Sequence, residues 1–477
     1  TPASSRRWAK RDSSCSRASW KERRPLAGRA LLSRAAIAPA ELENRVGGAG
    51  RMSDTIFAVS SGTPPCAIAV VRISGPDAGG AVATLAGALP EPRRASLRTL
   101  RDANGGLLDS ALVLRFPGPR TATGEDLAEL HCHGGRAMIA AILGELAGFD
   151  NLRHAEAGEF TRRAFANGVL DLAEAEGLGD LLAAETELQR QGALLSAGGS
   201  LSQRIEEWRS RVLGLAAAVE AVIDFADEDD VAGLPPGFTD ETEDLVAEIR
   251  RVAGRPEAER LRDGVRVILA GPPNAGKSSL FNALLADDAA IVTPEAGTTR
   301  DVLERSVGIA GVPFVLVDTA GMRKEGAGVI EEMGIQRARR AVESGQIVLW
   351  LGEPEEAPDG AIIVASKSDL GSADQGPADV KVSSVTGQGM DLLVDMIVER
   401  GKAALPPVDR IAFNRRQKEC ALAAADNLAQ LDISGDLLIG AERLRSARRA
   451  LDRLVGRDST SVDAADPDCA YIVRIIE

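Results

Sequence analysis

The sequence predicts a multidomain protein in which an α/β domain is inserted into an all-α helical domain, after an N-terminal α+β domain. Three observations favour this architecture. Residues 52–168 contain short apolar runs bounded by Gly and Pro, which is typical of strands. From about residue 171, and again from about 411, apolar residues recur at helical spacing. Between these parts, residues 263–400 alternate strand-like and helix-like stretches.

The α+β assignment rests on four strand-like runs and one helix. Gly134 and Gly135 begin an apolar stretch that predicts a helix to about Leu146. The runs predicted as strands are 55–59, 67–73, 111–116 and 127–133.

The all-α assignment rests on an apolar seam whose members are alternately four and three residues apart. Such a seam needs other helices to cover it, so we expect a bundle. In the second helical stretch, five arginines surround Leu444, Leu451 and Leu454, a pattern that indicates a solvated helix face rather than an RNA contact. The seam comprises Leu201, Ile205, Trp208, Val212, Leu215, Val219 and Val222, and the arginines are Arg443, Arg445, Arg448, Arg449 and Arg453.

Charge separates the first 51 residues from the rest of the chain. They hold twelve Lys and Arg against four acids, so the total of −14 leaves −22 for residues 52–477. We expect residues 1–51 to be a disordered or mis-translated leader before Met52, with an organelle transit peptide as the alternative. A body this acidic excludes a broad RNA-phosphate footprint.

Cysteine usage and hydropathy favour a cytoplasmic protein. The five cysteines are scattered without paired spacing, which fits a reducing compartment better than a disulfide framework. No apolar run reaches the length of a membrane span.

The central motif is Gly271–Ser279, which fits the phosphate-binding pattern G-x-x-x-x-G-K-[ST]. It follows the strand-like run 265–270 and precedes a helix-like run that ends near Leu285. Backbone N–H groups and the helix N-terminus can cradle phosphates, Lys277 adds a point charge, and the Ser278 hydroxyl can ligate Mg²⁺. A nucleoside triphosphate is the predicted ligand.

Four further elements follow in the order of a Ras-like P-loop GTPase. Thr299 in Gly297–Asp301 completes a Mg²⁺ shell, and Asp318–Gly321 supplies an acid and a glycine N–H for the γ-phosphate. Asp369, in Ser366–Asp369, can accept both guanine N1–H and N2–H, which favours GTP over ATP. The run Ser383–Gly387 would contact the far edge of the guanine.

Three departures from the common pattern stand out. Ser366 stands at the first position of the guanine motif, where Asn or Thr is usual, so we expect it to hold the guanine-binding loop less tightly. Only residues 353–360 separate two strand-like runs, fewer than a parallel crossover helix normally needs. Met322 follows Gly321 where Ras-like proteins have a water-orienting Gln, so water must be positioned by another group.

Together with the phosphate loop, five segments carry a family resemblance. Over residues 52–457 the chain resembles the bacterial tRNA modification GTPases of the MnmE (TrmE) family. The segments are Val70–Pro76, Thr123–Asp126 with Glu129, His133–Gly135, Gly158–Phe165 and Leu170–Glu176.

The resemblance implies the following domain limits and assembly. A folate-binding domain that forms a homodimer spans residues 52–168, the helical domain spans 169–262 and 407–477, and the G domain spans 263–406. The family's Cys motif near the C-terminus has no match here, and residues 458–477 read as an aberrant tail. The altered ends leave a nonfunctional copy as one alternative.

The resemblance also implies site residues. Asn274 would ligate K⁺ with Thr293, Glu295 and Thr298, while Glu331 would orient water. Arg72 and Glu129 would contact 5-formyl- or methylene-tetrahydrofolate, and the third family position, often Lys, is Val169. Lys277 and Glu331 would be catalytic, and Ser278 and Thr299 would ligate Mg²⁺. The residues that would contact GTP are Asn274, Ala275, Gly276, Lys277, Ser278, Ser279, Asp318, Thr319, Ala320, Gly321, Ser366, Lys367, Asp369, Ser383 and Ser384.

The activity implied by the resemblance is K⁺-stimulated GTP hydrolysis. It would accompany aminomethyl or carboxymethylaminomethyl modification of C5 of the tRNA wobble uridine, U34, with an FAD-dependent partner of the MnmG/GidA type. The alternative is a ribosome-assembly switch of the Era or EngA kind that modifies nothing.

Overall fold

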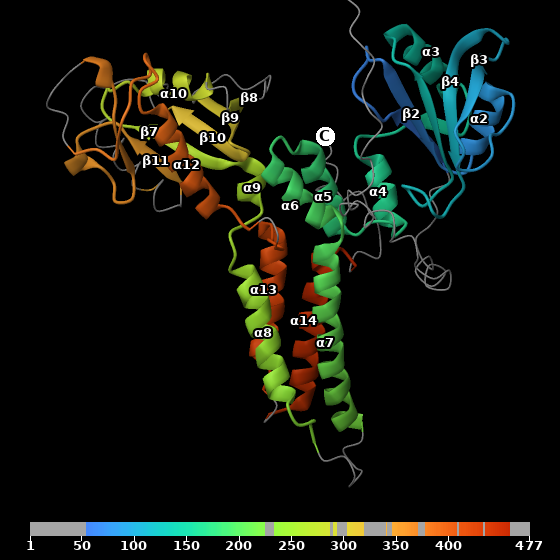
Figure 1. Cartoon of the computed structure of the whole chain (residues 1–477). Helices are drawn as coiled ribbons and strands as arrows, with labels where there is room; N and C mark the ends of the chain where they lie inside the picture. The colour runs from blue at the N-terminus through green and yellow to red at the C-terminus, as the bar shows by residue number, and fades with distance from the viewer. Residues whose placement is uncertain are drawn as a thin grey trace, which may run out of the picture.

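A computed structural model of the chain contains two sheets joined through a helical bundle (Figure 1). The structure describes residues 54–224, 233–286, 290–292, 303–318, 340, 346–370, 377–407, 410–432 and 435–457.

The N-terminal region is a six-stranded sheet with helices on one face. Its strand order is β3-β4-β5-β2-β1-β6, and only the β1–β6 pair is parallel. Side chains such as Phe57, Val71 and Leu130 form a core with α2 and α3. Because successive strand side chains point to opposite faces of a sheet, Arg72 and Glu129 lie on the other face. The elements are β1 (Thr55–Val59), β2 (Ile68–Ser74), α2 (Ala78–Ala86), β3 (Ser96–Arg101), β4 (Leu107–Phe116), β5 (Leu127–His133), α3 (Arg136–Ala147) and β6 (Leu152–His154).

The helical region contains four long helices side by side, with α5 and α6 at one end (Figure 1). Six of the seven predicted seam residues are buried on α7, and Val222 is partly buried. They pack with residues from α8, α13 and α14 in one core. The helices are α4 (Glu159–Ala166), α5 (Leu172–Ala183), α6 (Glu187–Ala197), α7 (Ser200–Asp224), α8 (Phe238–Ala253), α13 (Arg415–Ala429) and α14 (Leu437–Leu454).

Glu176 on α5 joins the two sequence-distant halves of the helical region. Its carboxylate, 5% exposed, accepts hydrogen bonds from Arg416 Nε at 3.0 Å and Asn414 Nδ2 at 3.0 Å. It also contacts Gln417 Nε2. A buried carboxylate persists only when its oxygens are satisfied, so this cluster fixes the start of α13 against α5.

The inserted region is a seven-stranded sheet of order β13-β12-β11-β7-β10-β9-β8. The strands from β13 to β10 run parallel, and β9 and β8 pair antiparallel at the other edge. Its elements are α9 (Glu259–Asp263), β7 (Val265–Ala270), α10 (Lys277–Leu285), β8 (Ala290–Val292), β9 (Leu303–Ile309), β10 (Val312–Asp318), β11 (Ile347–Trp350), η2 (Pro354–Glu356), β12 (Ile362–Ala365), η3 (Ser368–Leu370), β13 (Val380–Lys381) and α12 (Met390–Ala404).

The short connection between β11 and β12 holds only the single 3-10 turn η2. Trp350, the last residue of β11, lies in a small buried cluster beside this connection. Its indole is 2% exposed, clusters with Val348 and Ala361, and donates from Nε1 to Glu353 O at 2.9 Å. An aromatic side chain buries roughly 150–250 Å², so Trp350 covers part of the sheet beside this short connection.

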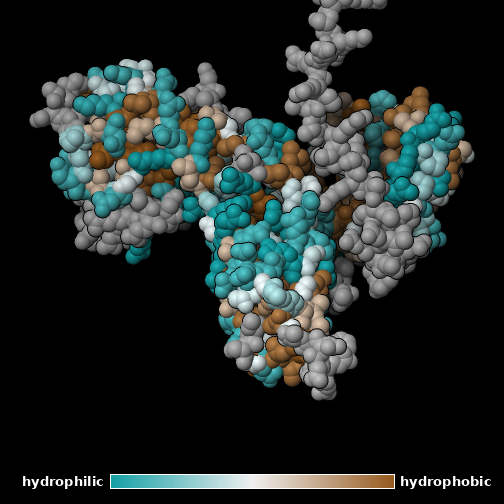
Figure 2. Space-filling view, turned by 60° about the horizontal axis from the view of Figure 1, so that its bottom comes forward, coloured by the Kyte–Doolittle hydropathy of each residue, from teal (hydrophilic) through white to brown (hydrophobic). Residues whose placement is uncertain are grey.

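The bundle surface is mostly hydrophilic in Figure 2, with hydrophobic residues gathered near its lower end in that view. On α14, Arg445 and Arg449 pair with Glu442 at 3.2 and 3.4 Å. None of the helices in the described residues combines the length and apolarity of a membrane span. The predicted fold class is confirmed, while the domain limits stay a prediction.

Candidate nucleotide-binding site

The phosphate loop leaves the end of β7 and enters α10. Gly271, Asn274 and Gly276 have φ values of 137°, 64° and 94°, in the region that favours glycine. A Cβ on Gly271 would lie 2.9 Å from the carbonyl carbon of Leu351, so only glycine fits there. The loop therefore leads the chain into a helix N-terminus, the arrangement that binds phosphate.

Lys277 is held across the loop. Its ammonium donates to the carbonyls of Gly271 at 2.9 Å and Pro272 at 2.6 Å, and the residue is 8% exposed. The stem is buried and the charge stays within the loop, where a phosphate would meet it.

Ser278 and Asp318 meet at the loop although 40 residues separate them. Asp318 ends β10, which runs parallel to β7, so the two strand ends lie at one edge of the sheet. The Ser278 hydroxyl donates to Asp318 Oδ2 at 2.7 Å, and Asp318 is 1% exposed. A hydroxyl and a carboxylate are oxygen ligands suited to Mg²⁺, so these residues fit that ion.

A cavity of about 230 Å³ lies beside the loop. Asp369 lines it, and the Ser383 hydroxyl donates to Asp369 Oδ1 at 2.7 Å. Ser383 Oγ also accepts from the backbone of Thr386 at 3.2 Å, which orients the carboxylate. The cavity is lined by Gly276, Ser279, Leu280, Ser366, Lys367, Asp369, Leu370, Val382, Ser384 and Val385.

Ser366 and Lys367 connect the predicted guanine motif to the phosphate loop. Ser366 Oγ donates to Ala275 O at 2.5 Å, and Lys367 Nζ donates to Asn274 O at 2.7 Å. Lys367 adopts φ 59°, a conformation uncommon outside glycine that tends to mark functional sites. The serine therefore still reaches the loop, although the sequence predicts a looser contact.

Eight predicted site residues lie outside the described residues, so their roles stay predictions. They are Thr293, Glu295, Thr298, Thr299, Thr319, Ala320, Gly321 and Glu331. Of the four predicted K⁺ ligands, Asn274 alone is among the described residues, and its backbone belongs to the phosphate loop.

In the N-terminal sheet, Arg72 and Glu129 are paired directly across β2 and β5. Arg72 Nη2 donates to Glu129 Oε1 at 2.9 Å, and their side chains are 27% and 18% exposed. The Arg72 guanidinium lies 5.7 Å from the centre of the Phe160 ring, while Val169 is 39% exposed. A charged pair beside an aromatic ring can hold a flat polar ring through hydrogen bonds and stacking.

A buried ion network holds α4 in place, and sequence reasoning missed it. Arg163, 1% exposed, donates to Asp54 Oδ1 at 2.9 Å, Glu159 Oε1 at 3.1 Å and Glu125 Oε2 at 3.1 Å. Arg153 Nη2 donates to Glu159 Oε1 at 2.6 Å. Burial alone would raise the pKa of Glu159, but the hydrogen bonds from Arg153 and Arg163 outweigh it and lower the pKa.

Two family models match the chain. The GTP-binding protein TrmE N-terminus matches residues 55–169, and the MnmE helical domain matches residues 172–463. The G domain of the T. maritima FeoB iron transporter, a solved structure, is 28% identical, covering 28% of this chain and 98% of that chain with a TM-score of 0.21.

Curated relatives extend the match to most of the chain. A tRNA modification GTPase MnmE of Erythrobacter litoralis is 55% identical over 85% of this chain and 96% of that protein. A second, from Rhizorhabdus wittichii, is 53% identical over 88% of this chain and 96% of that protein. These findings do not favour the Era or EngA alternative. The chain therefore belongs to the MnmE family of tRNA modification GTPases.

Proposed function

We propose that this GTP hydrolase is stimulated by K⁺ and acts with an FAD-dependent partner of the MnmG/GidA type. The pair would install an aminomethyl or carboxymethylaminomethyl group on C5 of the tRNA wobble uridine. The observation that carries the GTPase part is the meeting of Ser278 with Asp318 beside the cavity that Asp369 lines. The modification part rests on family membership.

Different described residues would bind the guanine, the phosphates and the Mg²⁺ of the nucleotide. Asp369, oriented by Ser383, would accept from guanine N1–H and N2–H. The loop backbone and Lys277 would bind the β- and γ-phosphates, so Lys277 would meet charge as it develops. Ser278 and Asp318 would hold Mg²⁺, which when bound neutralises the phosphate oxygens.

Hydrolysis needs a group that positions water, and Met322 cannot hydrogen-bond to water as a glutamine does. We assign this role to Glu331. Asn274, Thr293, Glu295 and Thr298 would bind K⁺, whose charge near the phosphates would supply what an arginine finger supplies elsewhere.

The N-terminal sheet would hold the one-carbon donor, a 5-formyl- or methylene-tetrahydrofolate. Arg72 and Glu129 offer a donor and an acceptor side by side, and Phe160 offers a ring for stacking. The protein would act as a cytoplasmic homodimer. Because the body is acidic, tRNA would be held largely through the partner protein.

The test is reconstitution with purified components. The full chain, a MnmG-type protein with FAD and NADH, methylene-tetrahydrofolate, GTP and unmodified tRNA are incubated, and nucleosides are measured by mass spectrometry. We expect a C5-modified wobble uridine that disappears when the chain is omitted or carries Ser278→Ala. Unmodified tRNA with the wild-type chain, or equal modification by the variant, would contradict the proposal.

A further inference from the structure

The β3–β4 hairpin and its flanking loops form a basic segment in an otherwise acidic body. Residues 93–120 contain six arginines and two aspartates, a net charge of +4, whereas residues 52–477 together carry −22. β3 is an edge strand, and Figure 1 shows the hairpin at the side of the N-terminal sheet away from the helical bundle. The arginines are Arg93, Arg94, Arg98, Arg101, Arg115 and Arg120.

Most of these arginine charges have no acidic partner. Among the residues that the structure describes, Arg94 pairs with Glu91 at 2.7 Å, and the other five arginines form no ion pair within 4 Å. The two aspartates of the segment are engaged elsewhere. Asp102 Oδ1 accepts from two backbone N–H groups of its own turn at 2.9 and 2.7 Å, and Asp109 Oδ1 lies 2.7 Å from His133 Nδ1. The hairpin therefore presents positive charge that an external anion can compensate.

Arg93 is fixed in place by its turn and by an aromatic ring. The turn is closed by a hydrogen bond from Arg94 N to Glu91 O at 3.3 Å, and the φ of Arg93, 61°, lies in the region that favours glycine. Such strain tends to mark functional positions. The guanidinium lies 5.8 Å from the centre of the Phe116 ring and donates from Nη2 to the Arg120 carbonyl. Because a guanidinium has five N–H donors, it can still bind a phosphate.

The Arg93–Phe116 pair lies on the same sheet face as the Arg72–Glu129 pair. Leu114 is directly opposite Glu129, and Phe116 is two residues farther along β4, so its side chain projects from the same face roughly 7 Å away. Arg72 is opposite Glu129 on β2. A polynucleotide bound at Arg93 and Phe116 would therefore pass beside the residues proposed to hold the one-carbon donor.

We propose that this hairpin binds RNA, with Arg93 and Arg120 contacting phosphates and the Arg93–Phe116 pair contacting a base. Unstacked bases of RNA loops stack on aromatic rings and guanidinium planes. The inference rests on the proposed function, which makes a tRNA the RNA to be bound. Phosphate contacts fix register and orientation, so a few of them can orient the anticodon loop while the partner protein supplies most of the affinity.

An anionic membrane is the rival partner, because two leucines opposite each other on the hairpin, Leu97 and Leu112, are 70% and 38% exposed. The charge distribution favours RNA. A bilayer surface extends far beyond the hairpin and would meet the acidic remainder of the chain, which it would repel. An RNA loop can contact the basic segment alone.

The test measures binding of the full chain to a fluorescently labelled, unmodified tRNA by anisotropy, from about 50 to 300 mM NaCl. Arg93→Gln combined with Arg120→Gln should weaken binding roughly tenfold at the lowest salt. It should also reduce the slope of log affinity against log salt by roughly 1.4–1.8, because each lost phosphate contact removes about 0.7–0.9. Arg120→Gln alone, which changes an exposed loop side chain, should show about half of that slope change and keeps the test decisive if the double variant does not fold.

Phe116→Leu should weaken binding at least fivefold and leave the salt slope unchanged, because stacking is lost and no charge is removed. Arg250→Gln combined with Arg415→Gln is the matched control, since it removes the same charge from exposed positions on α8 and α13. We expect the control to change tRNA affinity less than about twofold. Thermal unfolding verifies that each variant is folded.

The binding measurement needs no GTP, one-carbon donor or partner protein, so it separates this proposal from the modification activity. Wild-type binding that depends on the hairpin would support the RNA surface even if reconstitution yields no modified uridine. No tRNA binding by the wild-type chain at the lowest salt, or equal losses in the hairpin and control variants, would overturn it even if modification occurs. Vesicles of phosphatidylcholine with phosphatidylserine are the second probe. Hairpin-dependent binding to these vesicles without hairpin-dependent binding to tRNA would also overturn it.

Discussion

At the residue scale, hydrogen-bond geometry explains why particular side chains of the nucleotide site can do their chemistry. The motif alone predicts that Asp369 contacts guanine, and the fold adds the hydrogen bond from Ser383 that orients its carboxylate. The motif predicted which residues matter. It cannot predict that Ser366 donates to Ala275, because residues 91 apart in the sequence meet there only in the folded chain.

Asp369→Asn should change which base the site prefers. The amide replaces one acceptor oxygen with a donor, so it mismatches guanine N2–H and matches the carbonyl of xanthine. Competition binding should show GTP affinity falling roughly a hundredfold, consistent with loss of a buried hydrogen bond to a charged group and creation of a mismatch. XTP affinity should rise.

Asp395→Asn, on the exposed face of α12, is the matched control and should retain GTP preference. Unchanged GTP selectivity in Asp369→Asn would remove this residue from the guanine site.

At the element scale, the periodicity of apolar residues predicts the well-buried strands and helices and misses the short or half-exposed strands. The apolar runs of β7 and β10 and the seam of α7 were readable because burial imposes a clear pattern. The edge strand β3 and the two-residue β13 were not predicted, since short or half-exposed strands carry little pattern. The role of Trp350 in covering the sheet also depends on neighbours that only the fold supplies.

The buried network around α4 is another element that no local pattern predicts, because its acids come from three separate segments. Glu159→Gln should destabilise the N-terminal region by roughly 3 kcal/mol at pH 7, since it breaks a buried pair and leaves Arg153 and Arg163 undercompensated. Thermal unfolding of the full chain, followed by hydrogen exchange in α4, measures this loss.

The same substitution should matter less in acid. The folded-state pKa of Glu159 is lowered, so its stabilisation is present above its ordinary pKa of 4.5 and disappears as the pH falls through the folded value. The gap between wild type and variant should therefore narrow below pH 4.5. Glu156→Gln, whose side chain is 67% exposed, should change stability little at either pH. An equal loss of stability in Glu159→Gln and Glu156→Gln would contradict the claim that the buried ion network stabilises the N-terminal region.

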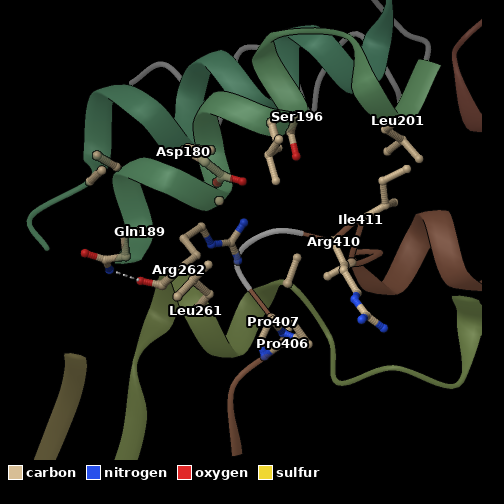
Figure 3. Close-up of a pocket in the computed structure, with 17 residues that line it drawn as sticks. Asp180, Gln189, Ser196, Leu201, Leu261, Arg262, Pro406, Pro407, Arg410 and Ile411 are labelled. Atoms are coloured by element: carbon tan, nitrogen blue, oxygen red, sulfur yellow. Dashed lines mark hydrogen bonds between the residues drawn. The ribbon is translucent and has the colours of Figure 1, made fainter. Parts of the chain in front are cut away.

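At the scale of the whole molecule, an acidic body carries a GTPase domain between the halves of a helical domain. The resemblance to the family predicts this arrangement, because family motifs occur in the N-terminal region, at the start of the helical domain and in the G domain. It cannot place the cavity that Leu261 and Ile411 both line, because these residues are far apart in the sequence and meet only in the folded chain (Figure 3).

The central claim is that K⁺ completes a GTPase that has no glutamine to orient water. The most direct test compares initial rates of GTP hydrolysis by the full chain in KCl and in NaCl at equal ionic strength, with Mg²⁺ present. We predict a rate at least roughly tenfold higher in KCl, because a fixed cation at the phosphates acts as an arginine finger does. Asn274→Ala should abolish that difference. Equal rates in the two salts for the wild-type chain would contradict the account.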